Sequence, residues 1–477
     1  MSGYIIGTSR TQSILFPELL DEYIQADNPV RVVDLYIDSL DLQQLGFQRS
    51  VPSHTGRPGY SPAMMLKLYV YGYLNRIQAS RQLERESQRN VELMWLTQRL
   101  TPDFKTIADF RKNNATGIKN VCGSFVQLCR RLNLFSDAIV AIDGSKFKAS
   151  NNPDKNYTRT TIKRKIDRTE QHIDDYLKEL DRNDALEDAQ DDGVPMKEKI
   201  ERMKEHLKKL KTLEAQVKAS PDQQVSLTDP DCRAMKTGAM NRVVGYNVQT
   251  AVDTKHHLIV AHEVTNARSD RQQLYPIGKR VQSALHRTDI TAITDKGYYS
   301  SEVIKQSHDI GITAIMPKTQ TSGNAKKGLF TNDHFHYDPE KNVYICPARQ
   351  ELSHSLMSGE GEKTLLVYGS VKTCKDCAIK SQCTPSKLRR IRRWLHEDLL
   401  EDMEARVKSM PDVMHVRKRT VEHPFGTIKS WMGSTHFLTR GFKSVGTEMD
   451  LNVLAYNLKR MMSIMGPQEL MAAMRNA

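Results

Sequence analysis

The sequence has few cysteines, few aromatic side chains and no long apolar run. Its 477 residues include 7 cysteines, too few and too uneven for a disulfide scaffold. No apolar stretch approaches the roughly 18 residues that a membrane-spanning helix needs. Residues 1–20 lack the basic start and the continuous apolar centre of a secretory signal. We therefore expect a cytoplasmic globular protein with no membrane partner.

Acidic side chains are outnumbered by basic ones. The chain has 70 Lys and Arg against 57 Asp and Glu, which gives a formal net charge of +13. This excess favours a polyanionic partner, because Lys and Arg neutralise phosphates and release their counterions. A generally basic soluble protein would have the same balance, so the charge alone leaves both interpretations open.

Helical periodicity dominates the first part of the chain, residues 10–135. Within it, Ser61 followed by Pro62 is a strong signal for the start of a helix. The run that follows combines an apolar stripe with basic side chains, which suits either contact with DNA or a solvated surface. We predict a helical DNA-binding region at residues 1–135.

Residues 158–220 differ from the rest in composition, because Lys, Glu, Asp, Gln and Leu dominate them. Apolar residues recur there at three- and four-residue spacing on both sides of a break, DDGVP, at residues 191–195. This pattern predicts an antiparallel coiled-coil hairpin inserted into the fold. Its charged faces favour a structural role, such as a dimer contact, over catalysis.

Two apolar runs that resemble buried strands each end in a carboxylate. Residues 139–142 are followed by Asp143, and residues 290–294 by Asp295. An aspartate near a glycine commonly forms a tight turn, so each could be a turn former or a reagent.

The segment between these two runs is predicted to be a β-hairpin at residues 245–265, and then a helix capped by Ser269 or Asp270. The order strand, hairpin, helix, strand predicts an α/β fold. In such folds the strand ends bring carboxylates together on one side of a sheet.

A third carboxylate, Glu422, lies in the helical run HVRKRTVEHPFGTIKSW. Alone it would be interpreted as an ordinary glutamate in a helical salt bridge. Three carboxylates from separate elements, however, can hold two divalent ions about 4 Å apart at a phosphodiester. Mg²⁺ suits such a site, because it prefers oxygen ligands and binds substrate phosphate.

Several motifs together resemble one family, the bacterial insertion-sequence DDE transposases. They are AIDGSKFKAS, SLTDPDCRAMK, GYNVQTAVD, ITDKGYYS, RTVEHPFGTIK and LTRGFKSVGTEMDLNVLAYNLKRM. The resemblance implies an RNase H-like catalytic core with Asp143, Asp295 and Glu422 as its acidic triad. It also implies two Mg²⁺ or Mn²⁺ ions per site, cleavage and strand transfer on double-stranded DNA, and a homodimer on element ends and target. A bacterial protein of this kind would associate with the nucleoid when bound to DNA.

The helix that carries the glutamate in this family commonly also carries a tyrosine, an arginine and a lysine. Lys429 matches that lysine, whereas Lys418 stands at the arginine position and His415 at the tyrosine position. Arg417 or Arg419 can substitute for the arginine. We predict DNA contacts for Arg417, Lys418, Arg419 and Lys429.

Four of the seven cysteines gather in one segment: Cys346, Cys374, Cys377 and Cys383. Four thiolates are the usual number for a tetrahedral structural Zn²⁺, and reduced cysteines packed in a small β-rich subdomain are the alternative. The run KLRRIRRW at residues 387–394 follows directly. Its bases and tryptophan suit either DNA contact or a solvated helix start, and the predicted contacts are Arg389, Arg390, Arg392 and Arg393.

Together these patterns predict four parts. They are a helical region at 1–135, a catalytic core at 136–157, 221–330 and 405–477, a coiled-coil hairpin at 158–220, and a cysteine-rich insertion at 331–404. The alternatives to an active transposase are a catalytically inactive, transposase-derived DNA-binding protein and an RNase H-like nuclease that cuts without strand transfer.

Overall fold

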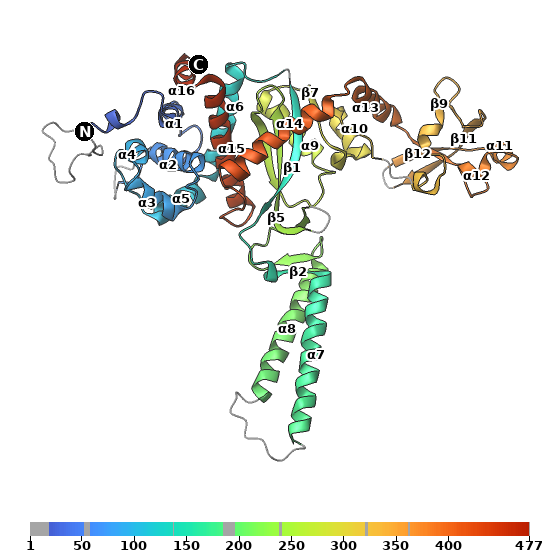
Figure 1. Ribbon diagram of the computed structural model, residues 1–477, viewed down its shortest axis with the longest axis horizontal. Helices are drawn as coiled ribbons and strands as arrows, with labels where there is room; N and C mark the ends of the chain where they lie inside the picture. The colour runs from blue at the N-terminus through green and yellow to red at the C-terminus, as the bar shows by residue number, and fades with distance from the viewer. Residues whose placement is uncertain are drawn as a thin grey trace, which may run out of the picture.

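A central sheet separates a helical region from a small second sheet, and a long helical hairpin projects from the middle (Figure 1). The computed structural model describes residues 19–51, 58–136, 138–184, 196–237, 241–319, 323–360 and 363–476. The predicted mixture of α and β structure is confirmed. None of the helices within these ranges is long and apolar enough to cross a membrane.

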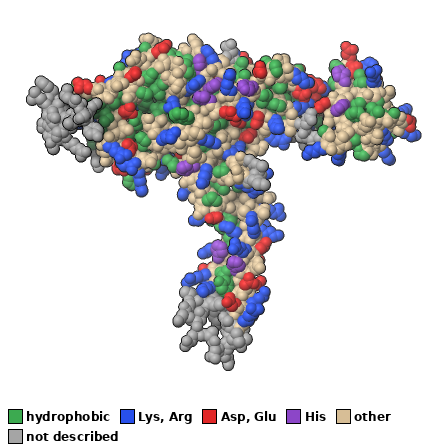
Figure 2. Space-filling view, viewed as in Figure 1, with side chains coloured by type: hydrophobic (Ala, Val, Ile, Leu, Met, Phe, Trp, Pro, Cys, Tyr) green, Lys and Arg blue, Asp and Glu red, His purple; other side chains and the backbone are tan. Residues whose placement is uncertain are grey.

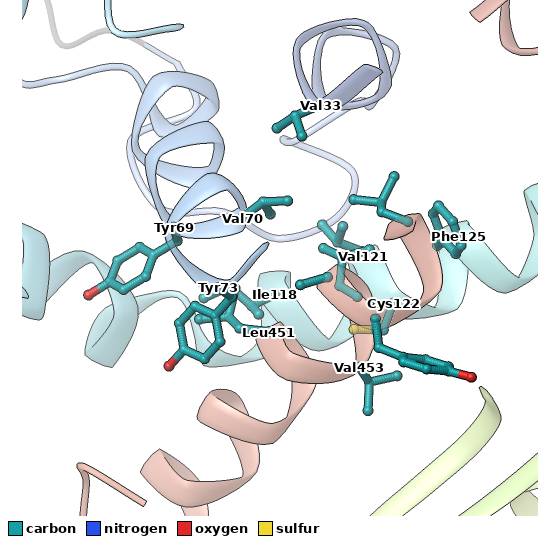
Figure 3. Packing of buried hydrophobic residues seen from close by; sticks show 14 of the residues in the cluster. Val33, Tyr69, Val70, Tyr73, Ile118, Val121, Cys122, Phe125, Leu451 and Val453 are labelled. Atoms are coloured by element: carbon teal, nitrogen blue, oxygen red, sulfur yellow. The ribbon is translucent and has the colours of Figure 1, made fainter. Parts of the chain in front are cut away.

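Helices fill the chain before the first strand. They are η1 (Leu20–Tyr23), α1 (Pro29–Asp38), α2 (Pro62–Leu74), α3 (Ser80–Ser87), α4 (Val91–Leu96), α5 (Phe104–Asn113) and α6 (Ala115–Arg131). Helix α2 begins at Pro62, as the Ser-Pro signal predicts, and almost all of its side chains are buried. The C-terminal α15 (Phe442–Met465) packs against α2 and α6, so both ends of the chain share one core. Figure 3 shows Tyr69, Phe125 and Leu451 within this core.

The central sheet has six strands. They are β1 (Ile139–Lys148), β4 (Arg233–Lys236), β5 (Arg242–Asp253), β6 (Ile259–Thr265), β7 (Ile290–Ile293) and β8 (Ile312–Ile315). Strand β1 pairs antiparallel with β5 and parallel with β7, and β8 continues beside β7. Strands β5 and β6 form the predicted antiparallel hairpin.

Helices cover both faces of this sheet. On one face, Val140 and Ile142 of β1 pack with α9 (Leu274–Leu285) and α10 (Ser301–Asp309). On the other, Ile139 and Ile293 pack near Val413, the first residue of α14 (Val413–Gly426). Alternation along β1 therefore directs Asp143 to the face that α14 covers.

Two predicted boundaries are wrong. Strand β1 does not end at Asp143 but continues to Lys148, because β5 pairs with it along its whole length. Helix α9 begins at Leu274 with Gln273 as its N-cap, so neither Ser269 nor Asp270 caps it.

The hairpin is formed by α7 (Arg159–Asp184) and α8 (Met196–Ala219), which pack against each other. Ile162, Ile166 and Leu210 form part of its buried seam. At its base, β2 (Asn156–Thr158) pairs with β3 (Gln224–Ser226). The DDGVP break lies outside the described residues.

The cysteine-containing segment forms a second, antiparallel sheet in the order β13-β12-β11-β10-β9. Its strands are β9 (His336–Asp338), β10 (Val343–Ile345), β11 (Glu351–Glu360), β12 (Lys363–Tyr368) and β13 (Ile391–Trp394), with helices α11 (Val371–Lys375) and α12 (Lys380–Cys383). The KLRRIRRW run enters strand β13, so the helix start considered for it is wrong. Three longer segments follow or flank α14 and α15: α13 (Glu397–Ser409), the π-helical η6 (Thr427–Trp431) and α16 (Pro467–Asn476). Short 3₁₀ turns are η2 (Pro153–Lys155), η4 (Ala325–Lys327) and η5 (Asn332–His334).

Candidate active site

Asp143 and Asp295 lie level with each other on adjacent strands. The parallel register pairs Ala141 with Ile293, and each aspartate follows two residues later. Strand β7 ends at Ile293, whereas β1 continues. The edge of β1 at Asp143 is therefore open on the β7 side, and the two carboxylates lie at this opening.

Arg417 of α14 connects the two carboxylates. Its Nη2 lies 2.6 Å from Asp143 Oδ1 and 3.9 Å from Asp295 Oδ2. The same nitrogen donates to the carbonyl oxygen of Ile142 at 3.4 Å. Only 12% of the Arg417 side chain is exposed. The structure thus directs this arginine, which we predicted to contact DNA, towards the acids.

The two aspartates have different surroundings. Burial raises the pKa of Asp143, the positive charge of Arg417 opposes that shift, and the charges of Asp295 and Asp270 add to it. Asp295 is 44% exposed, and its Oδ1 accepts a hydrogen bond from the Gly297 amide at 2.8 Å. This bond caps the short helix η3 (Lys296–Tyr298). Asp295 is thus a turn former, and its other oxygen still faces Arg417.

Glu422 lies apart from the aspartates. Its side chain is 64% exposed, and its Oε1 lies 3.9 Å from Lys418 Nζ on the same helix. Within the described ranges, no three His, Cys, Asp or Glu side chains come close enough to hold a metal ion. The structure thus brings together two of the three predicted acids.

Lys429 reaches β1 from η6, the π-helical turn that follows α14. Its Nζ donates to Ser145 Oγ at 2.7 Å and to the Lys146 carbonyl oxygen at 2.9 Å, and it lies 4.4 Å from the centre of the Phe147 ring. Burial lowers the pKa of this lysine, and the nearby Asp143 charge partly opposes the change. Lys429 therefore holds β1 just beyond Asp143.

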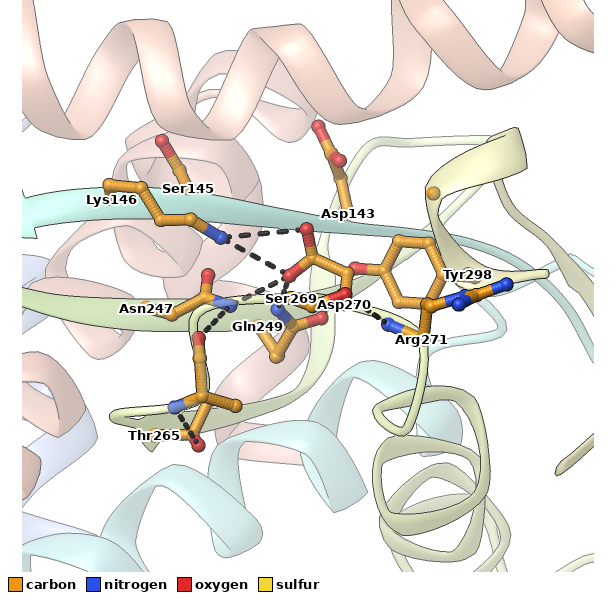
Figure 4. A network of polar contacts seen from close by, with 12 residues as sticks. Asp143, Ser145, Lys146, Asn247, Gln249, Thr265, Ser269, Asp270, Arg271 and Tyr298 are labelled. Atoms are coloured by element: carbon orange, nitrogen blue, oxygen red, sulfur yellow. Dashed lines mark hydrogen bonds and ion pairs between the residues drawn. The ribbon is translucent and has the colours of Figure 1, made fainter. Parts of the chain in front are cut away.

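A polar network under β1, centred on Asp270, was not predicted to belong to the site. Asp270 Oδ1 accepts hydrogen bonds from Asn247 Nδ2 and Gln249 Nε2, both at 2.7 Å, and from Lys146 Nζ at 3.3 Å. Figure 4 shows Asp143 on one side of the strand and Asp270 on the other. Gln249 also accepts from the buried hydroxyl of Tyr298. The network therefore joins β1, β5 and the turn that follows Asp295.

The absence of a side chain at Gly144 lets Gln249 and Asp270 lie close to β1. A Cβ at this position would lie 2.3 Å from Gln249 Nε2 and 2.6 Å from Asp270 Oδ1. The Asp-Gly pair therefore marks a crowded point within a strand, and the turn considered from the sequence does not form.

The four clustered cysteines lie beside the second sheet, Cys346 after β10, Cys374 in α11, Cys383 in α12 and Cys377 between these two helices. In the described part of the chain no three of them are close enough to hold a metal ion. Cys346, Cys374 and Cys383 pack against the buried aromatic core of this sheet. Burial raises the pKa of the Cys383 thiol, and the charges of the other three cysteines add to that increase. No disulfide joins them.

The arginines of the KLRRIRRW run divide into two kinds. Arg393 is buried, pairs with Glu401 and lies over the Tyr337 ring at 3.8 Å. Arg389 lies over the Phe335 ring at 5.2 Å. Both stabilise the packing of the second sheet, so the DNA contact predicted for Arg393 does not fit its position. Arg390 and Arg392 are exposed.

Two aspartates thus lie side by side on a sheet of parallel and antiparallel strands, and Arg417 of α14 lies against both. Residues 18–113 match the model described as a transposase domain (DUF772), and residues 345–462 match the transposase DDE domain. The second match includes Glu422 and the clustered cysteines. These two matches bear out the resemblance to the insertion-sequence DDE transposases.

No curated protein matches the sequence. Among solved structures, the chain is similar to the piggyBac transposase in a cryo-EM synaptic complex with hairpin DNA. The identity is 10% and the TM-score 0.31, with 95% of this chain and 79% of that chain covered. A likeness at this level carries no information about shared function.

Proposed function

We propose that the protein is an active DNA transposase. It binds the double-stranded ends of its insertion sequence, cleaves them in a metal-dependent reaction and transfers the freed strands to target DNA. The observation that carries this proposal is the register of Asp143 and Asp295 on adjacent strands, in a chain with two transposase-domain matches.

The strand order supports an RNase H-like catalytic core. Across the sheet the strands run β6-β5-β1-β7-β8, with β5 antiparallel to its neighbours. The short β4 also pairs with β5, and when it is set aside this order is third, second, first, fourth and fifth along the chain. We assign this core to residues 136–157, 221–330 and 405–477, the DNA-binding helices to 1–135, the hairpin insertion to 158–220 and the cysteine-rich insertion to 331–404.

The donor chemistry of the site suits a divalent cation. The carboxylates of Asp143 and Asp295 both lie within 4 Å of one guanidinium nitrogen, so they can share one positive charge. Two Mg²⁺ or Mn²⁺ ions, when bound, would activate a hydroxyl nucleophile and stabilise the leaving oxygen. Glu422 would complete the ligand set once α14 turns it towards the aspartates. Lys429 and the Asp270 network hold β1 rigid beneath Asp143.

DNA contacts are assigned to exposed bases around the site. On α14 these are Lys418 and Arg419, and in the second sheet Arg390 and Arg392. Arg417 would move from the aspartates to a phosphate when cations bind. Figure 2 shows Lys and Arg side chains spread over all parts of this face of the molecule. We further propose a homodimer on DNA, a cytoplasmic, nucleoid-associated location and a structural Zn²⁺ at the four cysteines.

Strand cleavage tests the proposal directly. A DNA fragment with the element's ends is incubated with Mg²⁺ and either the wild type or one of Asp143→Ala, Asp295→Ala and Glu422→Ala. We expect the wild type to cut and each variant to bind DNA without cutting. A variant that cuts as well as the wild type would remove that acid from the triad.

The position of Glu422 favours one alternative, a catalytically inactive DNA-binding protein, because only two acids meet in the structure. Tight binding without cleavage by the wild type, in Mg²⁺ and in Mn²⁺, would establish this alternative. Cleavage without joined products would instead indicate a nuclease without strand transfer.

A further inference from the structure

A basic cavity lies between the N-terminal helices and the C-terminal part of the chain. Its volume is about 510 Å³, and α5, the end of the β1 segment and the start of α15 line it. Four basic side chains contribute to its wall, and the one acidic lining residue is Asp109. The basic residues are Arg111, Lys112, Arg440 and Lys443.

These bases remain available to a ligand. Lys112 and Lys443 are exposed, and in the described parts of the chain no carboxylate pairs with either of them. Arg440 uses its Nε to donate to the Ser150 carbonyl oxygen at 3.0 Å, which fixes the guanidinium at the rim. Arg111 lies over the Tyr69 ring at 5.7 Å, which holds it at the back of the cavity.

The rest of the lining also suits a phosphodiester. Hydroxyl groups of Ser150 and Ser444 line the cavity beside the bases. Lysine, arginine and hydroxyl side chains are the usual partners of DNA phosphates. The apolar side chains of Ala108, Ala115 and Leu438 complete the wall, and a deoxyribose can pack against such a surface.

Strand β1 leads from Asp143 towards the cavity, because Ser150, which lines the cavity, follows the end of this strand. Ser150 follows Asp143 by seven residues, and an extended chain rises about 3.3 Å per residue, so the two are at most about 23 Å apart. A DNA duplex rises about 3.4 Å per base pair, so this separation is at most about seven base pairs.

We propose that this cavity binds the DNA backbone within about seven base pairs of the phosphodiester held at Asp143 and Asp295. It thus joins the N-terminal helices and the catalytic core in one DNA-binding surface and sets the position of the cut. This inference rests on the proposed function and adds a binding site to it.

Charge reversal at the exposed bases tests the site. The double variant Lys112→Glu/Lys443→Glu is compared with Lys178→Glu/Lys199→Glu, which makes the same charge change at exposed lysines of the hairpin. Binding of end-sequence duplexes is measured by fluorescence anisotropy without divalent metal over a range of salt. We expect at least a tenfold loss of affinity and a salt slope shallower by about one to two in the first variant alone.

Duplex length supplies the decisive comparison. The loss of affinity should be full with duplexes that extend more than about seven base pairs from the cut, and it should disappear as they are shortened below that length. Lys112→Arg/Lys443→Arg should retain wild-type binding. Equal salt slopes in the two charge-reversed variants, with a wild type that binds and cuts, would overturn the cavity assignment and leave the proposed function intact. A wild type that binds no DNA would overturn both.

Discussion

Arg417 Nη2 lies 2.6 Å from Asp143 Oδ1, and the same nitrogen lies 3.9 Å from Asp295 Oδ2. One guanidinium therefore offsets part of the negative charge of the two aspartates in the protein without metal. A divalent cation that binds these oxygens must displace this guanidinium, because both positive charges need the same carboxylates.

Replacement of Arg417 by glutamine should strengthen cation binding in the absence of DNA, because the competing charge is gone. We expect an increase on the order of tenfold, or ~1.4 kcal/mol. Titration with Mn²⁺ followed by electron paramagnetic resonance measures it. Arg419→Gln, on the exposed side of the same helix, is the matched control. Unchanged or weaker binding by Arg417→Gln would show that the arginine does not compete with the cation.

Asp270→Asn should slow cleavage and reduce the stability of the fold. Asparagine removes the charge opposite Lys146 and replaces one of the two oxygens that face this lysine with an NH₂ donor, while its remaining oxygen can still accept from Asn247 and Gln249. The expected cost is about 1–3 kcal/mol in the free energy of unfolding. Urea denaturation and single-turnover cleavage measure the two effects. Full cleavage activity in this variant would mean that the network has no influence on Asp143.

Gly144→Ala should be destabilising by about 1–3 kcal/mol, because its methyl group would overlap with Gln249 and Asp270. Gly123→Ala on α6 is the control, since no atom lies within 4 Å of the added Cβ. That control should stabilise the protein by roughly 0.5–1 kcal/mol. Similar thermal unfolding midpoints for the two variants would contradict the crowding at Gly144.

The stability of the protein should fall as the pH drops below about 6.5, the ordinary pKa of histidine. Burial lowers the pKa of His257 in the folded state, and nearby Arg460 adds to the shift. The unfolded chain then binds the proton first, so acid favours unfolding, by at most about 1.4 kcal/mol per pH unit for this group. The loss continues down to the lowered pKa.

His257→Asn should flatten this pH dependence, and asparagine tolerates the positive φ of 58° at this position. His172→Asn, at an exposed site on α7, should leave it unchanged. Urea midpoints measured between neutral and mildly acidic pH test the pair. A slope identical to wild type in His257→Asn would assign the effect to another group.

The clustered cysteines should hold one zinc ion per chain. Cys346, Cys374 and Cys383 pack on the core of one subdomain, and the charge of Cys377 acts on Cys383. Among the described residues no three of these side chains are close enough to hold a metal ion, so zinc would have to draw the four thiolates together and would then stabilise the subdomain. Elemental analysis of protein purified with zinc should therefore find the metal in wild type and lose it in Cys374→Ser/Cys377→Ser. Cys122→Ala, in the helical core, should keep it. Wild-type protein without zinc would favour reduced, packed cysteines.

The two aspartates could be predicted because apolar strands and their acidic neighbours are local patterns. The continuation of β1 past Asp143 could not be, because it depends on pairing with β5 a hundred residues later in the chain. Asp270 was noticed only as a possible helix cap, since its partners on β1 and β5 are set by the tertiary fold.

The positions of the basic side chains could not be predicted from the sequence either, because they too are set by the tertiary fold. Arg392 and Arg393 are neighbours in sequence, but the alternation of β13 exposes the first and buries the second against Tyr337 and Glu401. Arg417, Lys418 and Arg419 are consecutive, and only the helix orientation directs Arg417 to the aspartates. The excess of basic residues could be predicted from composition. Which of these side chains face the solvent and which face the protein depends on the packing of the fold.

The pairing of β2 with β3 has a consequence for how this chain is built. Asn156 lies opposite Ser226 and Thr158 opposite Gln224, so the chain leaves for the hairpin and returns from it at adjacent points. A tight turn between these strands could replace α7 and α8 altogether without moving β1. The hairpin is thus an exchangeable module, which the lineage of this protein could gain, lengthen or lose while the aspartates stayed where they are.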